Sequence, residues 1–211
     1  MKLWYSTTSP YARKVRAVIA HHRLDGLIEL NQVSSAPNQE SPHNQDVPLG
    51  RIPVLQRDNG NWLFNSQVIS EYLDSMGNGS SLYPRDDTRW DALNLNALAA
   101  GLLENTIPLV AEKMTRPESE WWSLRHEKAA QRNASTIAFL AKYVHKFGTE
   151  LNIGTLFAAC ALDYVLFRDR FINLRQALID HALHEWVVDM NGRYPCLAST
   201  QYVETNGNGD G

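Results

Sequence analysis

A run of hydroxyl side chains precedes the first helical pattern of this sequence. Ser6-Thr7-Thr8-Ser9 stands directly before Pro10, and Ser9 with Pro10 has the pattern of a helix N-cap and the first helical residue. Backbone N–H groups at a helix start carry a partial positive charge, and a hydroxyl there can donate a hydrogen bond to an anion. The segment Ser9-Pro10-Tyr11-Ala12 is therefore either an ordinary helix start or a site for an anionic group.

Two further turns allow the same pair of interpretations. In Gly50-Arg51-Ile52-Pro53-Val54-Leu55, Pro53 cannot donate to a strand ladder and Ile52 must be extended. This is typical either of an edge strand or of a cis-proline that aligns a peptide-like ligand. Asn65-Ser66 is a second strand-to-helix junction, at which an amino-acid carboxylate could bind. Three such turns within one small domain favour a binding site.

The elements that must position these turns follow from the hydrophobic pattern. A helix from Pro10 is predicted because apolar residues recur at helical spacing as far as His22. Strands are predicted at residues 2–5, 27–33, 52–56 and 62–64, with an Asn-Gly turn before the last and a helix capped by Ser66 after it. The polar segment 34–48 is a long loop or a ragged helix. The order β-α-β-(α)-β-β-α predicts a parallel strand pair joined to a hairpin, with helices on the faces.

The second part of the chain has a helical pattern and no convincing strand. Helices are predicted at 87–113 with a kink near Pro108, and at 118–147, 152–168 and 174–190. Residues 152–168 are apolar nearly all round, so we expect a buried central helix there. The predicted divisions are an α/β domain at 1–76, a linker at 77–85, an all-α domain at 86–204 and a disordered tail at 205–211.

Composition argues against several classes of protein. The net charge of the 211 residues is −3, whereas a nucleic-acid binder needs a basic stripe. No apolar signal region follows the first residues, and the most apolar stretch, Leu156–Phe167, is too short to span a bilayer. Cys160 and Cys196 fit no disulfide framework, and we expect both to be buried and reduced. The sequence therefore predicts a soluble cytoplasmic protein without membrane or nucleic-acid partners.

The remaining polar and aromatic clusters are expected to be structural. His181 and His184 stand at i, i+3 without a third ligand, so no metal site is predicted. The expected surface charges or salt-bridge partners are Arg13, Lys14 and Arg16, and the expected packing residues are Trp121 and Trp122.

Three segments carry a resemblance to a known family. In order and at the proper spacing, Tyr5–Arg16, Pro48–Leu55 and Leu63–Leu73 resemble the cytosolic glutathione S-transferases of a bacterial type. The resemblance continues at Ile153–Arg168 and Asp180–Thr200, so it covers nearly the whole chain. It implies a thioredoxin-like N-terminal domain, an all-helical C-terminal domain and a homodimer.

The resemblance also implies how glutathione would bind. Ile52 would pair its backbone with the cysteinyl part beside a cis-Pro53, and Arg51 would reach the glycyl end. Asn65 and Ser66 would hold the γ-glutamyl end. Many relatives have Glu or Asp where Asn65 stands, and the neutral amide lacks the charge-assisted strength of a carboxylate.

Ser9 matches the serine that holds the glutathione thiolate in serine-type transferases. With Ser9 and Ala12 at the positions of the two thioredoxin cysteines, a dithiol redox cycle is impossible. Lowering a thiol pKa by about two units needs roughly 2.7 kcal/mol, which a hydrogen bond and a helix start can supply. The rival hydroxyls are Ser6, Thr8 and Tyr5, of which Tyr5 is expected to point into the core.

Three functions remain open at this stage. The first is a transferase that conjugates glutathione, as co-substrate and without another cofactor, to small hydrophobic electrophiles in detoxification. The second is a non-catalytic binding or regulatory protein of the same fold, which the neutral Asn65 favours. The third is a specialised glutathione-dependent lyase, isomerase or dehalogenase. The electrophile site would be lined by the helical domain, with the helix at 87–113 as its main contributor.

Overall fold

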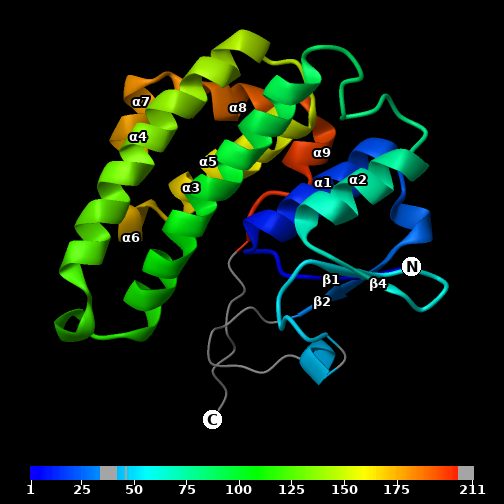
Figure 1. The fold of residues 1–211 in the computed structure, drawn as a ribbon, viewed down its shortest axis with the longest axis horizontal. Coiled ribbons are helices and arrows are strands. Elements are labelled where there is room, and N and C mark those ends of the chain that lie inside the picture. The colour runs from blue at the N-terminus through cyan, green and yellow to red at the C-terminus, as the bar shows by residue number, and fades with distance from the viewer. Residues whose placement is uncertain (34–41, 46, 204–211) are drawn as a thin grey trace. The chain divides into compact units, whose positions relative to one another are not determined.

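The computed structural model describes residues 1–33, 42–45 and 47–203 (Figure 1). The predicted tail at 205–211 and much of the segment 34–48 lie outside the described residues. The chain divides into two units, one formed by Met1–Ser80 with the segment that begins at Ala198, the other by Ser81–Leu197. The domain limits drawn from the sequence stay a prediction.

A four-stranded mixed sheet forms the centre of the first unit, in the order β2-β1-β3-β4. The strands are β1 (Lys2–Tyr5), β2 (Glu29–Gln32), β3 (Val54–Gln56) and β4 (Trp62–Phe64). β1 and β2 are parallel, whereas β3 is antiparallel to both β1 and β4. The predicted parallel pair joined to a hairpin is confirmed. β2 begins at Glu29 rather than at residue 27, because Asp25–Leu27 form a 3-10 turn. β3 begins at Val54 rather than at residue 52, because Pro53 cannot join a ladder.

Two helices, α1 (Pro10–His22) and α2 (Ser66–Met76), complete the core of this unit. The core includes the following side chains, each 1% exposed or less: Leu3, Val15, Ile19, Leu55, Ile69 and Leu73. Strands and helices contribute in the alternating and helical spacings that the sequence shows. Together with the helical second unit, this arrangement is the predicted thioredoxin-like domain followed by an all-α part.

The prediction that Arg13 and Lys14 lie on a solvated face of α1 is wrong, because they are 0% and 1% exposed. The Arg13 guanidinium lies 4.7 Å from the centre of the Tyr202 ring. Lys14 Nζ donates to Gln67 Oε1 at 2.8 Å and so links α1 to α2. Long aliphatic stems let both residues be buried while their charged ends reach partners, which residue type alone does not reveal.

The second unit is helical throughout. Its elements are α3 (Arg89–Thr115), η3 (Glu118–Glu120), α4 (Ser123–Phe147), α5 (Ile153–Phe167), α6 (Asp169–Ile172), α7 (Arg175–Asp180) and α8 (Leu183–Arg193), and α9 (Pro195–Ala198) crosses the boundary between the units. α3 continues through Pro108. The single helix predicted at 174–190 is wrong, because Ala182 adopts the left-handed conformation (φ 55°) between α7 and α8. None of the described helices has both the length and the apolar character needed to cross a membrane.

Helix α5 is the buried centre that its apolar sequence predicts. Twelve of its residues are buried, including Cys160, and a capping box fixes its start. Asn152 Oδ1 accepts the N–H groups of Gly154 and Thr155 at 2.9 and 3.0 Å. Thr155 Oγ1 accepts the Asn152 N–H at 2.9 Å, so the threonine side chain closes the box.

Replacing Gly154 by Ala should lower the free energy of unfolding, although alanine is the better helix former. A Cβ at Gly154 would lie 2.4 Å from the backbone oxygen of Ala92 on α3, so the two helices would have to move apart. We expect a loss of about 1–3 kcal/mol in urea unfolding. Gly101→Ala is the matched control, because its Cβ would meet no atom within 4 Å. A Gly154→Ala protein as stable as the control would contradict this packing.

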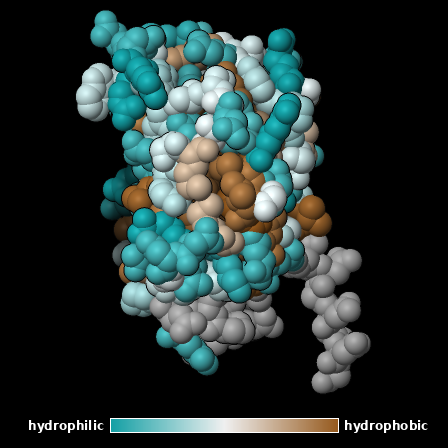
Figure 2. Space-filling model, turned by 90° about the vertical axis from the view of Figure 1, so that its right-hand side faces the viewer, coloured by the Kyte–Doolittle hydropathy of each residue, from teal (hydrophilic) through white to brown (hydrophobic). Residues whose placement is uncertain are grey.

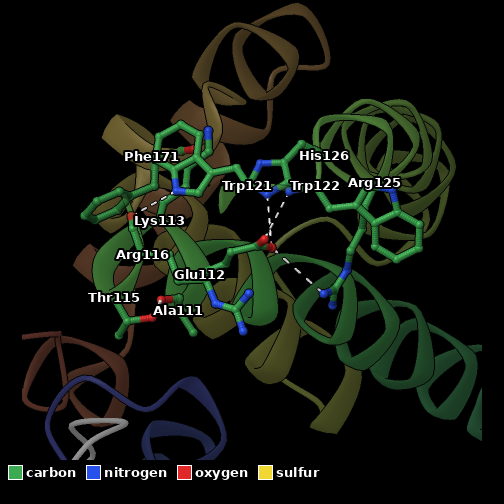
Figure 3. Close-up of polar contacts among 10 residues, drawn as sticks. All are labelled: Ala111, Glu112, Lys113, Thr115, Arg116, Trp121, Trp122, Arg125, His126 and Phe171. Carbon is green, nitrogen blue, oxygen red and sulfur yellow. Dashed lines mark hydrogen bonds and ion pairs between the residues drawn. The ribbon is translucent and has the colours of Figure 1, made fainter. Parts of the chain in front are cut away.

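A polar cluster around Glu112 holds the end of the α3–α4 hairpin (Figure 3). The Glu112 carboxylate accepts the backbone N–H of Trp122 at 3.2 Å and lies 3.1 Å from His126 Nε2. Trp122 is the N-cap residue of α4 and has no side-chain cap, so Glu112 places a negative charge at this helix start. Trp121 packs as expected, with its ring stacked on His126 and Nε1 donating to the Arg116 oxygen. Trp122, by contrast, is 63% exposed.

These contacts make the stability of the hairpin depend on pH. The Trp122 N–H first, and the hydrogen bond from His126 second, hold the pKa of Glu112 below its ordinary value. A carboxylate with a lower pKa in the folded state stabilises the fold above its unfolded pKa, and this contribution disappears as the pH falls through the folded pKa.

Glu112→Gln should therefore reduce stability at pH 7, and the difference from wild type should shrink as the pH falls below about 4.3. Urea unfolding at a series of pH values from 7 to 3 measures this difference. Glu104→Gln, at an exposed position of α3, is the control and should show no such trend. A Glu112→Gln difference that is constant with pH would contradict the assigned contacts.

Candidate functional site

The first of the three turns places Ser9 at the start of α1. Ser9 is extended (φ −84°, ψ 121°) and half-buried, and it caps the helix as predicted. Its Oγ accepts the N–H of Ala12 at 3.2 Å, and its carbonyl oxygen accepts the N–H of Arg13 at 2.9 Å. Among the described residues the Ser9 hydroxyl proton has no acceptor. Ser9 can therefore cap the helix and donate to an anion at the same time.

The rival hydroxyls are engaged elsewhere. Ser6 is 3% exposed, and its Oγ lies 3.4 Å from Thr8 Oγ1. Tyr5 is half-buried rather than enclosed in the core, and its hydroxyl donates to Gln32 Oε1 at 3.4 Å. Of these residues, only Ser9 stands at a helix start.

The second turn contains a cis peptide bond between Ile52 and Pro53. Pro53 is buried, whereas Ile52 is partly exposed. The ladder of β3 begins at Val54, and the backbone N–H and C=O of Ile52 have no partner among the described residues. Ile52 therefore offers one donor and one acceptor to an extended ligand. Arg51, which precedes it, has an exposed side chain.

The third turn differs from the sequence interpretation in its cap. Asn65, not Ser66, is the N-cap of α2, because Asn65 Oδ1 accepts the N–H of Gln67 at 2.8 Å. Asn65 has φ 70°, a conformation that few residues other than glycine adopt and that is often found at functional sites. Ser66 is only 6% exposed, and neither its hydroxyl nor its N–H has a partner within the described part of the chain. These two donors are available to an anion.

The strand register brings the three turns to one end of the sheet. Trp4 is opposite Val54, and Val54 is opposite Phe64, in a single row across three strands. The Ser9 turn follows β1, Ile52 precedes β3, and Asn65 follows β4, so all three leave the sheet beyond this row. Neither α1 nor α2 has an acidic residue in its first turn. The end of the sheet thus combines two helix starts with open hydrogen-bond donors and suits an anionic, peptide-like ligand.

The two histidines considered as a metal pair lie near a helix boundary. His181 and His184 are not on one helix, since α7 ends at Asp180 and α8 begins at Leu183. Within residues 1–33, 42–45 and 47–203 no group of three or more His, Cys, Asp or Glu could hold a metal ion.

Comparison with known proteins places this arrangement in a family. The model of the glutathione S-transferase N-terminal domain matches residues 8–76. YibF of Escherichia coli K12, described as an uncharacterized GST-like protein, is 31% identical over 174 residues, which cover 80% of this chain and 83% of YibF. The chain belongs to the glutathione S-transferase family.

Solved structures of glutathione transferases are similar to this protein over nearly its full length. A glutathione transferase family member from Pseudomonas fluorescens, with bound glutathione, is 30% identical with a TM-score of 0.88, covering 96% of this chain and 99% of its own. A glutathione S-transferase from Methylobacillus flagellatus, also with glutathione bound, is 28% identical with a TM-score of 0.82 and the same coverage.

The unusual backbone of Asn65 generates a test of the α2 start. Asn65→Ala removes the cap and leaves a Cβ at positive φ, so it should cost about 1–2 kcal/mol of unfolding free energy. Asn65→Gly also lacks the cap but tolerates the conformation, and it should cost only a few tenths of a kcal/mol. Urea unfolding of both variants measures the difference. A glycine variant that is less stable than the alanine variant would refute the assigned conformation.

Proposed function

We propose that this transferase-family protein binds glutathione at the three turns and transfers its thiolate to small hydrophobic electrophiles. One observation carries the proposal: the Ser9 hydroxyl oxygen accepts the Ala12 N–H at the start of α1, and its proton has no acceptor among the described residues. A donor in this place can stabilise a bound thiolate. The relatives from Pseudomonas fluorescens and Methylobacillus flagellatus, each with bound glutathione, support the choice of ligand.

The energetics of this role are sufficient. A free thiol has a pKa near 8.5, so only a few per cent of it is ionised at neutral pH. A hydrogen bond to a charged group contributes about 1.5–3 kcal/mol and a helix start about 0.3–1 kcal/mol. Together they can lower the thiol pKa by about two units. Because the Ala12 N–H donates into the same oxygen, the Ser9 hydroxyl becomes a stronger donor.

The other two turns would hold the peptide parts of glutathione. The N–H and C=O of Ile52 would pair with the backbone of the cysteinyl residue, as a strand pairs with an edge. The hydroxyl and N–H of Ser66, at the positive end of α2, would bind the γ-glutamyl carboxylate. Asn65 would lie beside this end of the ligand, and Arg51 would reach the glycyl carboxylate with its exposed side chain.

In the proposed reaction the thiolate sulfur attacks an electrophilic carbon of the second substrate. A carbon–sulfur bond forms, and the leaving group, for example the chloride of an aryl chloride, departs with its electron pair. Ser9 stabilises the thiolate before the attack and needs no proton transfer of its own. The electrophile site assigned to the helical domain, and the choice between conjugation and lyase, isomerase or dehalogenase chemistry, stay predictions.

A second candidate is a glutathione-binding protein without transferase activity. Asn65 favours it, because its amide oxygen is already used by the Gln67 N–H and carries no charge for the glutathione amino group. Binding would then be weaker than with a carboxylate at this position.

A glutathione titration of wild type and Ser9→Ala separates these functions. In wild type the thiolate absorbance of bound glutathione should appear well below the free thiol pKa. In Ser9→Ala this pKa should return upward by about one to two units, and turnover of an aryl halide should fall about ten- to a hundredfold. Ser6→Ala and Thr8→Val are matched controls that should change neither value.

Each other outcome has a definite meaning. A depressed thiol pKa that is unchanged in Ser9→Ala but raised in Ser6→Ala or Thr8→Val moves the role to that hydroxyl. A depressed thiol pKa without aryl-halide turnover favours the non-catalytic protein. No binding of millimolar glutathione by wild type would overturn the proposal.

The homodimer and the cytoplasmic location stay predictions. Figure 2 shows hydrophobic residues that reach the surface among hydrophilic ones. Among the described residues of α2 the exposed large apolar side chains include Val68 and Met76. Such side chains suit an interface between two copies of the chain.

A further inference from the structure

We propose that the segment Gln201–Val203, near the end of the chain, is a strap that positions the Ser9 turn. The positioning residues are Tyr202, on the strap, and Thr7, which precedes Ser9 and binds the strap. Its effect on the glutathione thiolate rests on the proposed function, whereas its effect on the turn does not. The segment from Ala198 onward belongs to the first unit, although it follows the whole helical unit in the sequence.

The strap contacts the chain on both sides of Ser9. Two residues before Ser9, Thr7 Oγ1 donates to the backbone oxygen of Val203 at 3.0 Å. Four residues after it, the Arg13 guanidinium lies 4.7 Å from the centre of the Tyr202 ring. Arg13 also donates its own backbone N–H to the Ser9 oxygen at 2.9 Å. Arg13 therefore contacts the strap through its side chain and Ser9 through its backbone.

Two contacts within residues 6–9 are long. The Ser9 N–H reaches the Ser6 oxygen at 3.4 Å, and the Ser6 and Thr8 hydroxyls are also 3.4 Å apart. Both distances are at the long limit for hydrogen bonds. The 3.0 Å bond from Thr7 to Val203 is shorter than either and adds a contact from outside the turn.

The burial of Arg13 explains why the Tyr202 ring matters. The Arg13 side chain belongs to a residue with 0% exposure, and a guanidinium in such a place needs partners for its charge. A ring face near a desolvated cation attracts it more strongly than at an exposed site. Removing the ring would expose the guanidinium to water and release the first turn of α1, on which Ser9 sits.

Amide hydrogen exchange of the turn and the thiol pKa of bound glutathione test the strap together. In Tyr202→Ala, exchange of the hydrogen-bonded amides within Ser9–Arg13, those of Ser9, Ala12 and Arg13, should rise about three- to thirtyfold, the factor expected from losing one cation–π contact. The thiol pKa should rise and glutathione affinity should fall by a similar factor. Tyr202→Phe keeps the ring, so its amide exchange, thiol pKa and glutathione affinity should stay at the wild-type values.

Two further variants separate positioning from general stability. Thr7→Val removes the bond to Val203 without touching Arg13, and it should increase exchange in the same amides. Tyr143→Ala truncates a half-buried tyrosine on α4 in the other unit. This control is expected to change overall stability but not the exchange of Ser9–Arg13 or the thiol pKa.

The outcomes distinguish the strap from the proposed function. Unchanged exchange of Ser9–Arg13 in both Tyr202→Ala and Thr7→Val would overturn the strap. Faster exchange in these variants, with glutathione affinity and thiol pKa unchanged, would overturn its role in positioning the site. Faster exchange in a protein whose wild type does not bind glutathione would support the strap and refute the proposed function. If Tyr202→Ala does not fold, Thr7→Val decides alone, and unchanged exchange in that variant would overturn the strap.

Discussion

The pairing of three strands along one row of residues sets the place of every candidate group. Trp4, Val54 and Phe64 share this row, and each of the three turns leaves the sheet just beyond it. A shift of one residue in any pairing would turn the side chains of that strand to the other face and move its turn out of line. The buried Leu3 and Leu55, paired in the neighbouring row, oppose such a shift. The hydrophobic core thus fixes the geometry of a polar site.

The electrostatic character of this end of the sheet depends on what its helix starts lack. First turns of helices commonly carry Asp or Glu, which offset the partial positive charge of the backbone. α1 and α2 carry none there, and α1 instead continues with Arg13 and Lys14, both buried. Local helix stability is therefore lower than it could be, while the attraction for an incoming anion is greater. This conflict between local preference and the observed sequence is typical of a binding site.

The sequence predicted those elements whose patterns are local. β1, β4 and the start of α1 agree with their hydrophobic spacing and with the Ser9-Pro10 cap, and the all-apolar α5 is the buried helix expected. The break at Ala182 could not be predicted, because alanine favours helix and only the packed structure imposes φ 55° there. Burial of Arg13 and Lys14 was missed because their partners are far away in the sequence, at Tyr202 and Gln67. For the same reason no local pattern pointed to Val203 beside Thr7.

The return of residues 198–203 to the first unit has a consequence for synthesis. A ribosome delivers residues 1–80 long before it delivers Tyr202 and Val203, and the contact of Thr7 with Val203 spans 196 residues. The sheet with α1 and α2 can assemble while the helical unit is still being made, since the core side chains from Leu3 to Leu73 all belong to early residues. Thr7 and Arg13 gain their contacts with the proposed strap only after residues 201–203 have left the ribosome. A nascent or truncated chain would thus have a folded sheet, but Thr7 and Arg13 would lack their contacts with Val203 and Tyr202.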